Sequence, residues 1–292
     1  MEKPIILSNI RVCVKGGGDI ASGVAWRLHQ CGLRVFITEI PQPMAVRRKV
    51  SFCEAVYDGH ALVEGVEGLL IKKADDVCSV WDQGKIPVLV DPECEAKHVI
   101  RPDVIVDAIL AKKNIGTSVN DAPLVIALGP GFEAGRDAAF VVETNRGHYL
   151  GRLLDSGSAE PDTGIPGSVQ GITSDRVLRA PADGSWENRM DIGSPVKKTD
   201  IIGYVAGVQT KALIDGVIRG MIRPGITVKT GDKIGDIDPR NKKEYCYSIS
   251  EKALAVSGGV LEGILRVCGS SGVFRKPSNQ GHGKILEKEK LN

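Results

Sequence analysis

The stretch that decides the fold of this chain is VCVKGGGDIASGVAWRL, residues 12–28. It begins as a β-branched apolar run and passes through three consecutive glycines. Ile20, Val24 and Leu28 then recur at the spacing of one helix face. A strand that enters a helix through glycines is typical of the first unit of a ligand-binding α/β fold, because glycines let the backbone approach a ligand and the helix N-terminus attracts anions.

The first half of the chain repeats this alternation of strand and helix. Several of its apolar runs are continuous rather than alternating, which indicates strands covered on both faces of a parallel sheet. The sequence therefore predicts the α/β class, with a Rossmann-like nucleotide- or cofactor-binding domain over residues 8–145. The later runs lie at 34–40, 69–73, 86–92, 103–110, 123–129 and 138–144.

The bulk composition excludes several function classes. A length of 292 residues suits two domains, and a net charge of +2 gives no electrostatic support for nucleic-acid or anionic-membrane binding. No apolar run approaches 18 residues and no signal-peptide pattern is present, so we expect a cytoplasmic location. Seven cysteines without CxxC spacing indicate free thiols. The five histidines lack metal-ligand spacing, so no metal site is predicted.

The glycine stretch carries most of the signal for a ligand. Gly16, Gly18 and Ala21 fit the pattern GxGxxA. Glu39 ends the next apolar run, where a carboxylate would reach ribose hydroxyls. Asp19 fits less well, because its carboxylate would compete with phosphates for the N–H groups of the helix start.

Three interpretations of this turn stay open. The glycines have the spacing of a P-loop, but Val24 and Ala25 replace its Lys-Ser/Thr pair, which argues against a P-loop NTPase. What remains is a nucleotide or dinucleotide site, a site for another anion, or a tight turn without a ligand.

Further loops should emerge at the same carboxyl edge of the sheet, where open α/β folds bind ligands. The loop at 41–49 carries a basic cluster suited to phosphate or carboxylate groups. The loop at 128–137 makes a second glycine turn that faces the first. The loop at 143–148 suits either a ligand or a salt-bridged hinge. The candidate cofactor-binding residues are Gly16, Gly17, Gly18, Asp19, Ser22, Glu39, Arg47, Arg48, Asp107, Gly129, Gly131, Arg146 and His148.

The second half contains an internal repeat. Residues 180–205 align without gaps on residues 212–237, with nine identities in 26 positions. Two copies of one β unit, each too short to bury a core alone, predict a small closed β-domain. The pattern resembles the biotinyl/lipoyl-type barrel-sandwich hybrid, over 178–246. Lys211 stands against the second copy without a flanking Met, so we expect a docking or lid module rather than a swinging arm.

The remaining segments complete the predicted organisation. Residues 146–177 connect the two domains, and residues 247–268 form an amphipathic helix weakened by three glycines. The polar stretch at 269–292 is expected to be a mobile tail.

Taken together, several strings of this sequence resemble one family. KGGGDIASGVAWRLH (15–29), EIPQPMAVRRKVSF (39–52), PDVIVDAILAKKN (102–114), LGPGFEAG (128–135) and VVETNRGHYLGR (141–152), with the APADG repeat, are similar to the YqeB family of the selenium-dependent molybdenum hydroxylase system. The resemblance covers about residues 10–267.

The resemblance implies a maturation factor for such a hydroxylase. It would bind a nucleotide-containing, molybdopterin-type cofactor and help to insert or selenate it. Its partners would be the hydroxylase apoenzyme and other maturation proteins, and a homo-oligomer is compatible with the sequence. Cys53, the candidate catalytic residue, would hold sulfur or selenium as a persulfide-like adduct, because the neighbouring cations favour a thiolate.

Two rival functions use the same residues. An NAD(P)-dependent oxidoreductase would use the glycines and Glu39, although the chain shows no Tyr-x-x-x-Lys pair. A non-catalytic, nucleotide-sensing docking module would use the β-domain to bind a client. Whether the chain is an enzyme stays open at this point.

Overall fold

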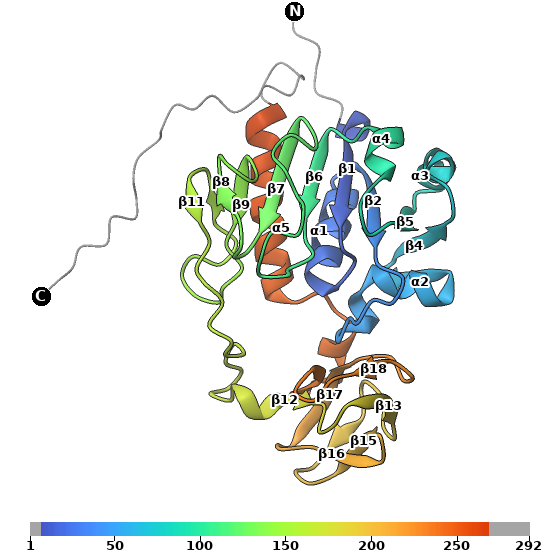
Figure 1. Ribbon diagram of the computed structural model, residues 1–292, viewed down its shortest axis with the longest axis vertical. Helices are drawn as coiled ribbons and strands as arrows, with labels where there is room; N and C mark the ends of the chain where they lie inside the picture. The colour runs from blue at the N-terminus through green and yellow to red at the C-terminus, as the bar shows by residue number, and fades with distance from the viewer. Residues whose placement is uncertain (1–6, 269–292) are drawn as a thin grey trace, which may run out of the picture.

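The computed structural model describes residues 7–268, so the predicted tail at 269–292 lies outside the described residues. A larger α/β part and a smaller β part are joined at the carboxyl edge of the large sheet (Figure 1). None of the helices in the described part of the chain is long and apolar enough to cross a membrane.

The α/β part is built on a nine-stranded sheet with the order β10-β9-β7-β6-β1-β2-β5-β4-β3. Seven strands are parallel, and the two edge strands, β3 and β10, are antiparallel to their neighbours. The predicted α/β class is thus confirmed, with antiparallel edges that the sequence did not reveal. The strands are β1 (Arg11–Lys15), β2 (Arg34–Glu39), β3 (His60–Val63), β4 (Val66–Ile71), β5 (Ile86–Val90), β6 (Val104–Asp107), β7 (Leu124–Leu128), β9 (Phe140–Val142) and β10 (Leu153–Leu154).

The strand order creates a switch point at the centre of the sheet. The chain moves from β1 to β2 on one side, and β6 pairs with β1 on the other. Ligands of open α/β sheets bind outside the carboxyl ends of the strands at such a point. The glycine turn follows β1 directly, so it stands at the switch point.

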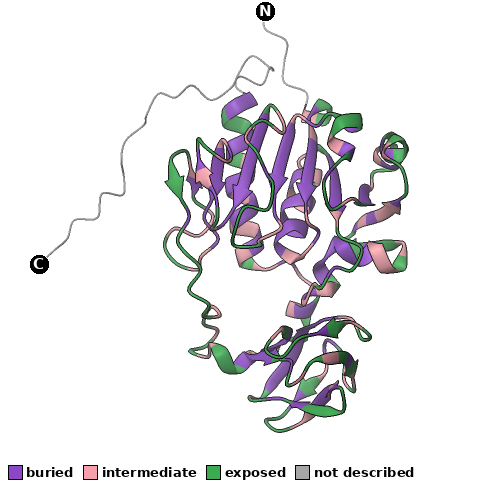
Figure 2. Cartoon of the chain, in the orientation of Figure 1, coloured by how far each residue is buried: buried purple, intermediate pink, exposed green. Residues whose placement is uncertain are grey.

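Helices cover both faces of the sheet, and the strands between them are buried (Figure 2). One face packs against α1 (Asp19–Gln30) and α5 (Glu251–Cys268), and the other against α3 (Val77–Asp82) and α4 (Ala96–Ile100). Shorter pieces are α2 (Ala55–Asp58), the 3₁₀ turns η1 (Leu7–Asn9), η2 (Arg48–Val50), η3 (Phe52–Glu54), η4 (Ala74–Asp76), η5 (Ser174–Arg176) and η6 (Lys243–Cys246), and the paired strands β8 (Glu133–Ala134) and β11 (Gly157–Ser158).

Glycines explain how α5 packs so closely on the α/β part. A Cβ on Gly23 of α1 would lie 2.7 Å from the Cβ of Ala253, and a Cβ on Gly259 would lie 2.3 Å from the carbonyl oxygen of Gly151. Gly259, which lowers the helix propensity of α5 by about 1 kcal/mol, therefore permits its close packing on the α/β part.

The β-domain shows the repeat directly in its strands. β13 (Gly184–Asn188), β14 (Pro195–Val196) and β15 (Ile201–Val205) recur as β17 (Gly216–Met221), β18 (Thr227–Val228) and β19 (Lys233–Asp238), each starting 32 residues later. The halves exchange their short strands, because β14 pairs with β17 and β13 with β18. With β12 (Val177–Arg179) and β16 (Val208–Lys211), they form two four-stranded sheets, β12-β19-β17-β14 and β16-β15-β13-β18, around a common core.

Residues 46–54 join the two parts. The carbonyl oxygen of Val46 accepts the N–H of Met221 at 2.7 Å, and Arg48 Nε donates to the carbonyl oxygen of Met221 at 3.0 Å. Arg223 of the β-domain pairs with Glu54 at 2.8 Å. The β-domain is therefore fixed against the loop that follows β2, beside the glycine turn.

Candidate functional site

Glycine stands at positions 16, 17 and 18 for a different structural reason at each. Gly16 has φ +92°, and a Cβ there would meet the carbonyl oxygen of Ala108 at 3.2 Å. A Cβ on Gly17 would lie 2.9 Å from the backbone nitrogen of Cys53. At Gly18 a Cβ would meet nothing within 4 Å. Gly16 and Gly17 are thus needed for internal packing, and Gly18 leaves the first turn of α1 open to an approaching group.

Glu39 and Ser22 hold the glycine turn in place through hydrogen bonds to its backbone. The Glu39 carboxylate accepts the N–H groups of Gly17 and Ile40, both at 2.7 Å, and burial raises its pKa. Ser22 Oγ donates to the carbonyl oxygen of Gly17 at 3.0 Å and accepts the N–H of Phe52 at 2.8 Å. Both side chains are engaged within the chain, so a ligand that used Glu39 would share it with two backbone donors.

Asp19 is the first residue of α1 and does not cap it. The N-cap is Gly18, and no side chain of the described residues makes a capping hydrogen bond there. Instead Asp19 Oδ2 lies 3.9 Å from Arg47 Nη1, with about a third of the side chain (35%) exposed. The Asp19 carboxylate therefore points toward the basic loop, beyond hydrogen-bonding distance.

Arg47 is the least satisfied polar side chain near this turn. It is only 6% exposed, and its Nη2 donates to the carbonyl oxygens of Tyr245 and Ser248 at 2.7 and 2.9 Å. Its Nε and Nη1 are buried without a hydrogen-bond partner among residues 7–268. Burial lowers the pKa of Arg47. Buried donors are rarely left unpaired, so this arginine is suited to an acceptor that the chain does not supply.

The charge of Asp19 acts on two lysines that the sequence did not single out, Lys233 and Lys252. Lys233 is the first residue of β19, and Lys252 lies in the first turn of α5. Desolvation lowers the pKa of both, and the charge of Asp19 acts on both in the opposite direction. The side chain of Lys233 is nevertheless exposed, so Lys233 lies at the surface rather than in a core. The repeat held a clue, since Lys233 stands where the first copy has Ile201.

A buried polar network lies under the switch point. Thr117 Oγ1 donates to Asp107 Oδ2 at 2.5 Å, and Lys15 Nζ donates to Thr117 Oγ1 at 2.6 Å. All three side chains are buried. Asp107 was predicted as a site residue, whereas Lys15 and Thr117 were missed, although a lysine that ends an apolar strand is itself a signal. The network is closed on itself and ties the ends of β1 and β6 together.

The second glycine turn, at 129–131, packs against the chain's own backbone. A Cβ on Gly129 would lie 2.5 Å from Thr144 Oγ1, and a Cβ on Gly131 would lie 2.5 Å from the Cα of Lys113. Both glycines have positive φ, +75° and +101°. Internal contacts thus account for both glycines.

The loop after β9 contributes a tie to α5. Arg146 Nη1 pairs with Glu251 Oε1 at 2.5 Å, which matches the salt-bridged hinge that the sequence left open. His148 is exposed and packs edge-on against Tyr149. Arg48 likewise pairs with Asp191 of the β-domain at 2.5 Å. Both arginines thus hold segments of the chain together.

The thiolate expectation for Cys53 is wrong. The side chain is 0% exposed, and burial raises its pKa well above the ordinary value, followed by the charges of Glu39, Glu54 and Asp19. Arg47 and Arg48 instead direct their guanidinium groups to Tyr245, Ser248, Met221 and Asp191. The Cys53 N–H donates to the carbonyl oxygen of Gly17, so Cys53 closes the turn over Gly17.

A thiol pair lies elsewhere in the sheet. Cys13 Sγ and Cys94 Sγ are 3.4 Å apart and buried. The hydrogen bond from Cys13 lowers the pKa of Cys94, while burial raises that of Cys13. This contact joins β1 to the turn before α4 and does not involve the glycine turn.

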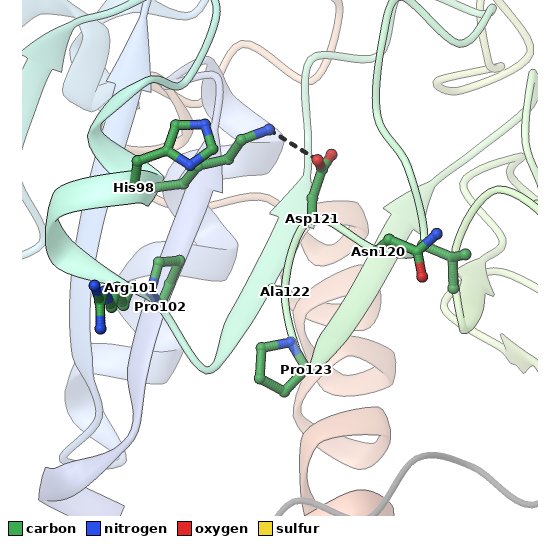
Figure 3. A pocket seen from close by; sticks show the side chains of 9 residues that line it. His98, Arg101, Pro102, Asn120, Asp121, Ala122 and Pro123 are labelled. Atoms are coloured by element: carbon green, nitrogen blue, oxygen red, sulfur yellow. Dashed lines mark hydrogen bonds and ion pairs between the residues drawn. The ribbon is translucent and has the colours of Figure 1, made fainter.

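A shallow open pocket of about 520 Å³ lies at the opposite, amino edge of the sheet. It is formed where α4 leads into β6 and where the chain enters β7, and the Lys97–Asp121 pair crosses it at 2.8 Å (Figure 3). None of the predicted site residues lines it. Its position, away from the carboxyl ends of the strands, makes it a poor candidate for the site.

No protein-family model matches the chain. A curated relative, the "Uncharacterized protein YqeB" of Escherichia coli (strain K12), is 45% identical over 254 residues, which is 87% of this chain and 47% of that protein. The alignment supports membership of the YqeB family. The chain spans about half the length of this curated relative, and the relative's name assigns no activity.

Solved structures give only weak likenesses. A succinylglutamate desuccinylase/aspartoacylase from Rhodobacter sphaeroides is 22% identical over 22% of each chain, with a TM-score of 0.21. The E. coli tRNA N6-threonylcarbamoyladenosine dehydratase TcdA, in complex with ATP, is 13% identical over 88% of this chain and 87% of its own, with a TM-score of 0.29. These scores are too low to carry an argument about fold or activity.

Proposed function

We propose that this chain is a maturation factor for a selenium-dependent molybdenum hydroxylase that binds a nucleotide-containing, molybdopterin-type cofactor at the carboxyl edge of its sheet. The observation that carries the binding half of the proposal is Arg47, a buried arginine beside the open first turn of α1 with two nitrogens that find no hydrogen-bond partner in the described part of the chain. The maturation half rests on the resemblance of the sequence to the YqeB family, since the name of the curated relative assigns no activity.

The donor set fits a phosphate-bearing cargo. The first turn of α1 offers unpaired N–H groups and the positive end of the helix dipole, and Gly18 leaves room for close approach. Arg47 supplies planar N–H donors that match phosphate geometry. Lys233 and Lys252 add charge from the β-domain and from α5. In this proposal the chain's residues bind and orient the cofactor, which is cargo for the client enzyme.

The β-domain is assigned the client-facing role in this proposal, as a barrel-sandwich hybrid. Its 32-residue repeat and the exchange of short strands between halves support that assignment. The domain is attached through Arg48 and Arg223 to the loop that covers the glycine turn. A client bound to the β-domain would therefore be close to the cargo.

Native mass spectrometry of freshly purified protein, compared with a denatured sample, tests the proposal. We expect a mass difference equal to a pterin dinucleotide, lost in Arg47→Met and kept in Arg136→Met, whose arginine lies on the surface. A mass difference equal to an adenine dinucleotide would instead favour the NAD(P)-dependent oxidoreductase. Mature hydroxylase formed at the normal level in cells that lack this protein would overturn the maturation role.

A further inference from the structure

The open turn of α1 carries a negative charge of its own. Anion sites at helix N-termini draw on unpaired N–H groups and the helix dipole, and a carboxylate in the first turn interacts favourably with the same dipole. Asp19 occupies that place here, with its Oδ2 3.9 Å from Arg47 Nη1. An anionic ligand at this turn must therefore replace Asp19 as the partner of Arg47.

Arg47 is only partly served by Asp19. A separation of 3.9 Å exceeds a hydrogen bond, and both Nη1 and Nε lack a hydrogen-bond partner within residues 7–268. The Nη2 atom, by contrast, holds the carbonyl oxygens of Tyr245 and Ser248. An incoming acceptor can bind the free nitrogens while the structural bonds of Nη2 stay in place.

Asp19 has room to leave. Its side chain is 35% exposed and makes no capping hydrogen bond within residues 7–268, so rotation into solvent breaks its loose pair with Arg47. The charge of Asp19 acts on three cations, Arg47, Lys233 and Lys252, and its departure leaves all three without that partner charge. The charge of Asp236, which pairs with Arg176 and Arg219, attracts Arg47 and Lys233, whereas the charge of Arg219 repels them.

We propose that Asp19 is an internal counter-ion that holds the place of a ligand phosphate on α1 and Arg47, and that its displacement sets the affinity of the site. The consequence is a moderate affinity for the phosphate ligand, which suits a protein that must release its cargo to a client. The inference depends on the proposed function only for the identity of that cargo. The ligand chemistry it names is a phosphate or pyrophosphate group.

The test uses inorganic pyrophosphate as the probe, titrated against the full chain and followed by ³¹P NMR. We expect Asp19→Asn to bind it roughly tenfold more tightly than the wild type, because a like charge a few ångströms away is removed. Asp76→Asn is the matched control: Asp76 is also exposed beside a helix start, at α3, and the same change in net charge there should leave the affinity unaltered. The gain should shrink at high salt.

The outcomes separate this inference from the proposed function. Equal affinities for Asp19→Asn and Asp76→Asn, or no pyrophosphate binding by either, would overturn the inference. Arg47→Lys, with its fold checked by thermal unfolding, should bind pyrophosphate more weakly, and unchanged binding would also overturn it. If Asp19→Asn binds as expected but the purified protein carries no pterin dinucleotide, the proposed cargo fails and the counter-ion stands.

Discussion

The two glycine turns at the carboxyl edge look alike in the sequence and differ in the structure. At 16–18 the last glycine faces open space at a helix start, and a buried arginine with unused donors stands beside it. At 129–131 the space that a Cβ would take is occupied, at Gly129 by Thr144 and at Gly131 by the backbone of Lys113. A glycine after a strand can therefore serve a ligand or a close internal contact, and only its neighbours in space decide which.

The most direct test of this difference is to add a side chain to the turn at 129–131. Gly131→Ala should lower the free energy of unfolding by roughly 3 kcal/mol or more, because the new Cβ meets the Lys113 backbone at 2.5 Å in a left-handed conformation. Gly135→Ala is the control for conformation alone, since Gly135 has φ +85° and nothing within 4 Å. It should cost about 1 kcal/mol. Urea unfolding measures both, and equal losses would show that the turn is not closed.

A side chain added to the turn at 16–18 should affect ligand binding more than stability. Gly18→Ala should change the free energy of unfolding by no more than about 1 kcal/mol, because its Cβ meets no atom. Its pyrophosphate affinity should fall several-fold, since the methyl group occupies the approach to α1. Gly17→Ala, whose Cβ would lie 2.9 Å from Cys53, should instead lose stability. Unchanged pyrophosphate binding in Gly18→Ala would place the ligand elsewhere.

The sequence predicts the fold better than the site, and the reasons are physical. Continuous apolar runs and the 32-residue repeat are local patterns, so the α/β class and the paired β units could be predicted. The unpaired nitrogens of Arg47 depend on tertiary contacts, because Tyr245 and Ser248, which lie 198 and 201 residues further along the chain, bind only its Nη2. The charges around Cys53 depend on side-chain direction, which spacing along the chain does not reveal.

The cations of the open turn should leave a signature in the pH dependence of stability. The pKa values of Lys233 and Lys252 are lowered from 10.5 by desolvation, so between the lowered pKa and 10.5 the unfolded chain binds more protons than the folded one. Stability should therefore rise with pH through that window. The effect should be below about 1 kcal/mol, because water screens both lysines.

Urea unfolding at neutral and at alkaline pH measures this rise in wild type and in Lys233→Met. The rise should be smaller in Lys233→Met, which removes one of the two titrating groups. Lys198→Met, on the exposed surface of the β-domain, should behave as the wild type does. A rise of equal size in Lys233→Met would mean that Lys233 does not face the desolvated side of the turn.

The smallest expected effect concerns Cys53. It tests whether the segment that carries Cys53 stays in place over Gly17 when a ligand binds. Cys53 is 0% exposed and its pKa is raised by burial, whereas Cys78 is exposed. Iodoacetamide at mildly alkaline pH, read by peptide mass spectrometry, should therefore label Cys78 and leave Cys53 unlabelled. Adding pyrophosphate should not change this, because Gly18 receives the ligand while the hydrogen bond from Cys53 to Gly17 persists. Labelling of Cys53 that appears with pyrophosphate would show that the segment over Gly17 lifts, and the open turn would then extend across two glycines rather than one.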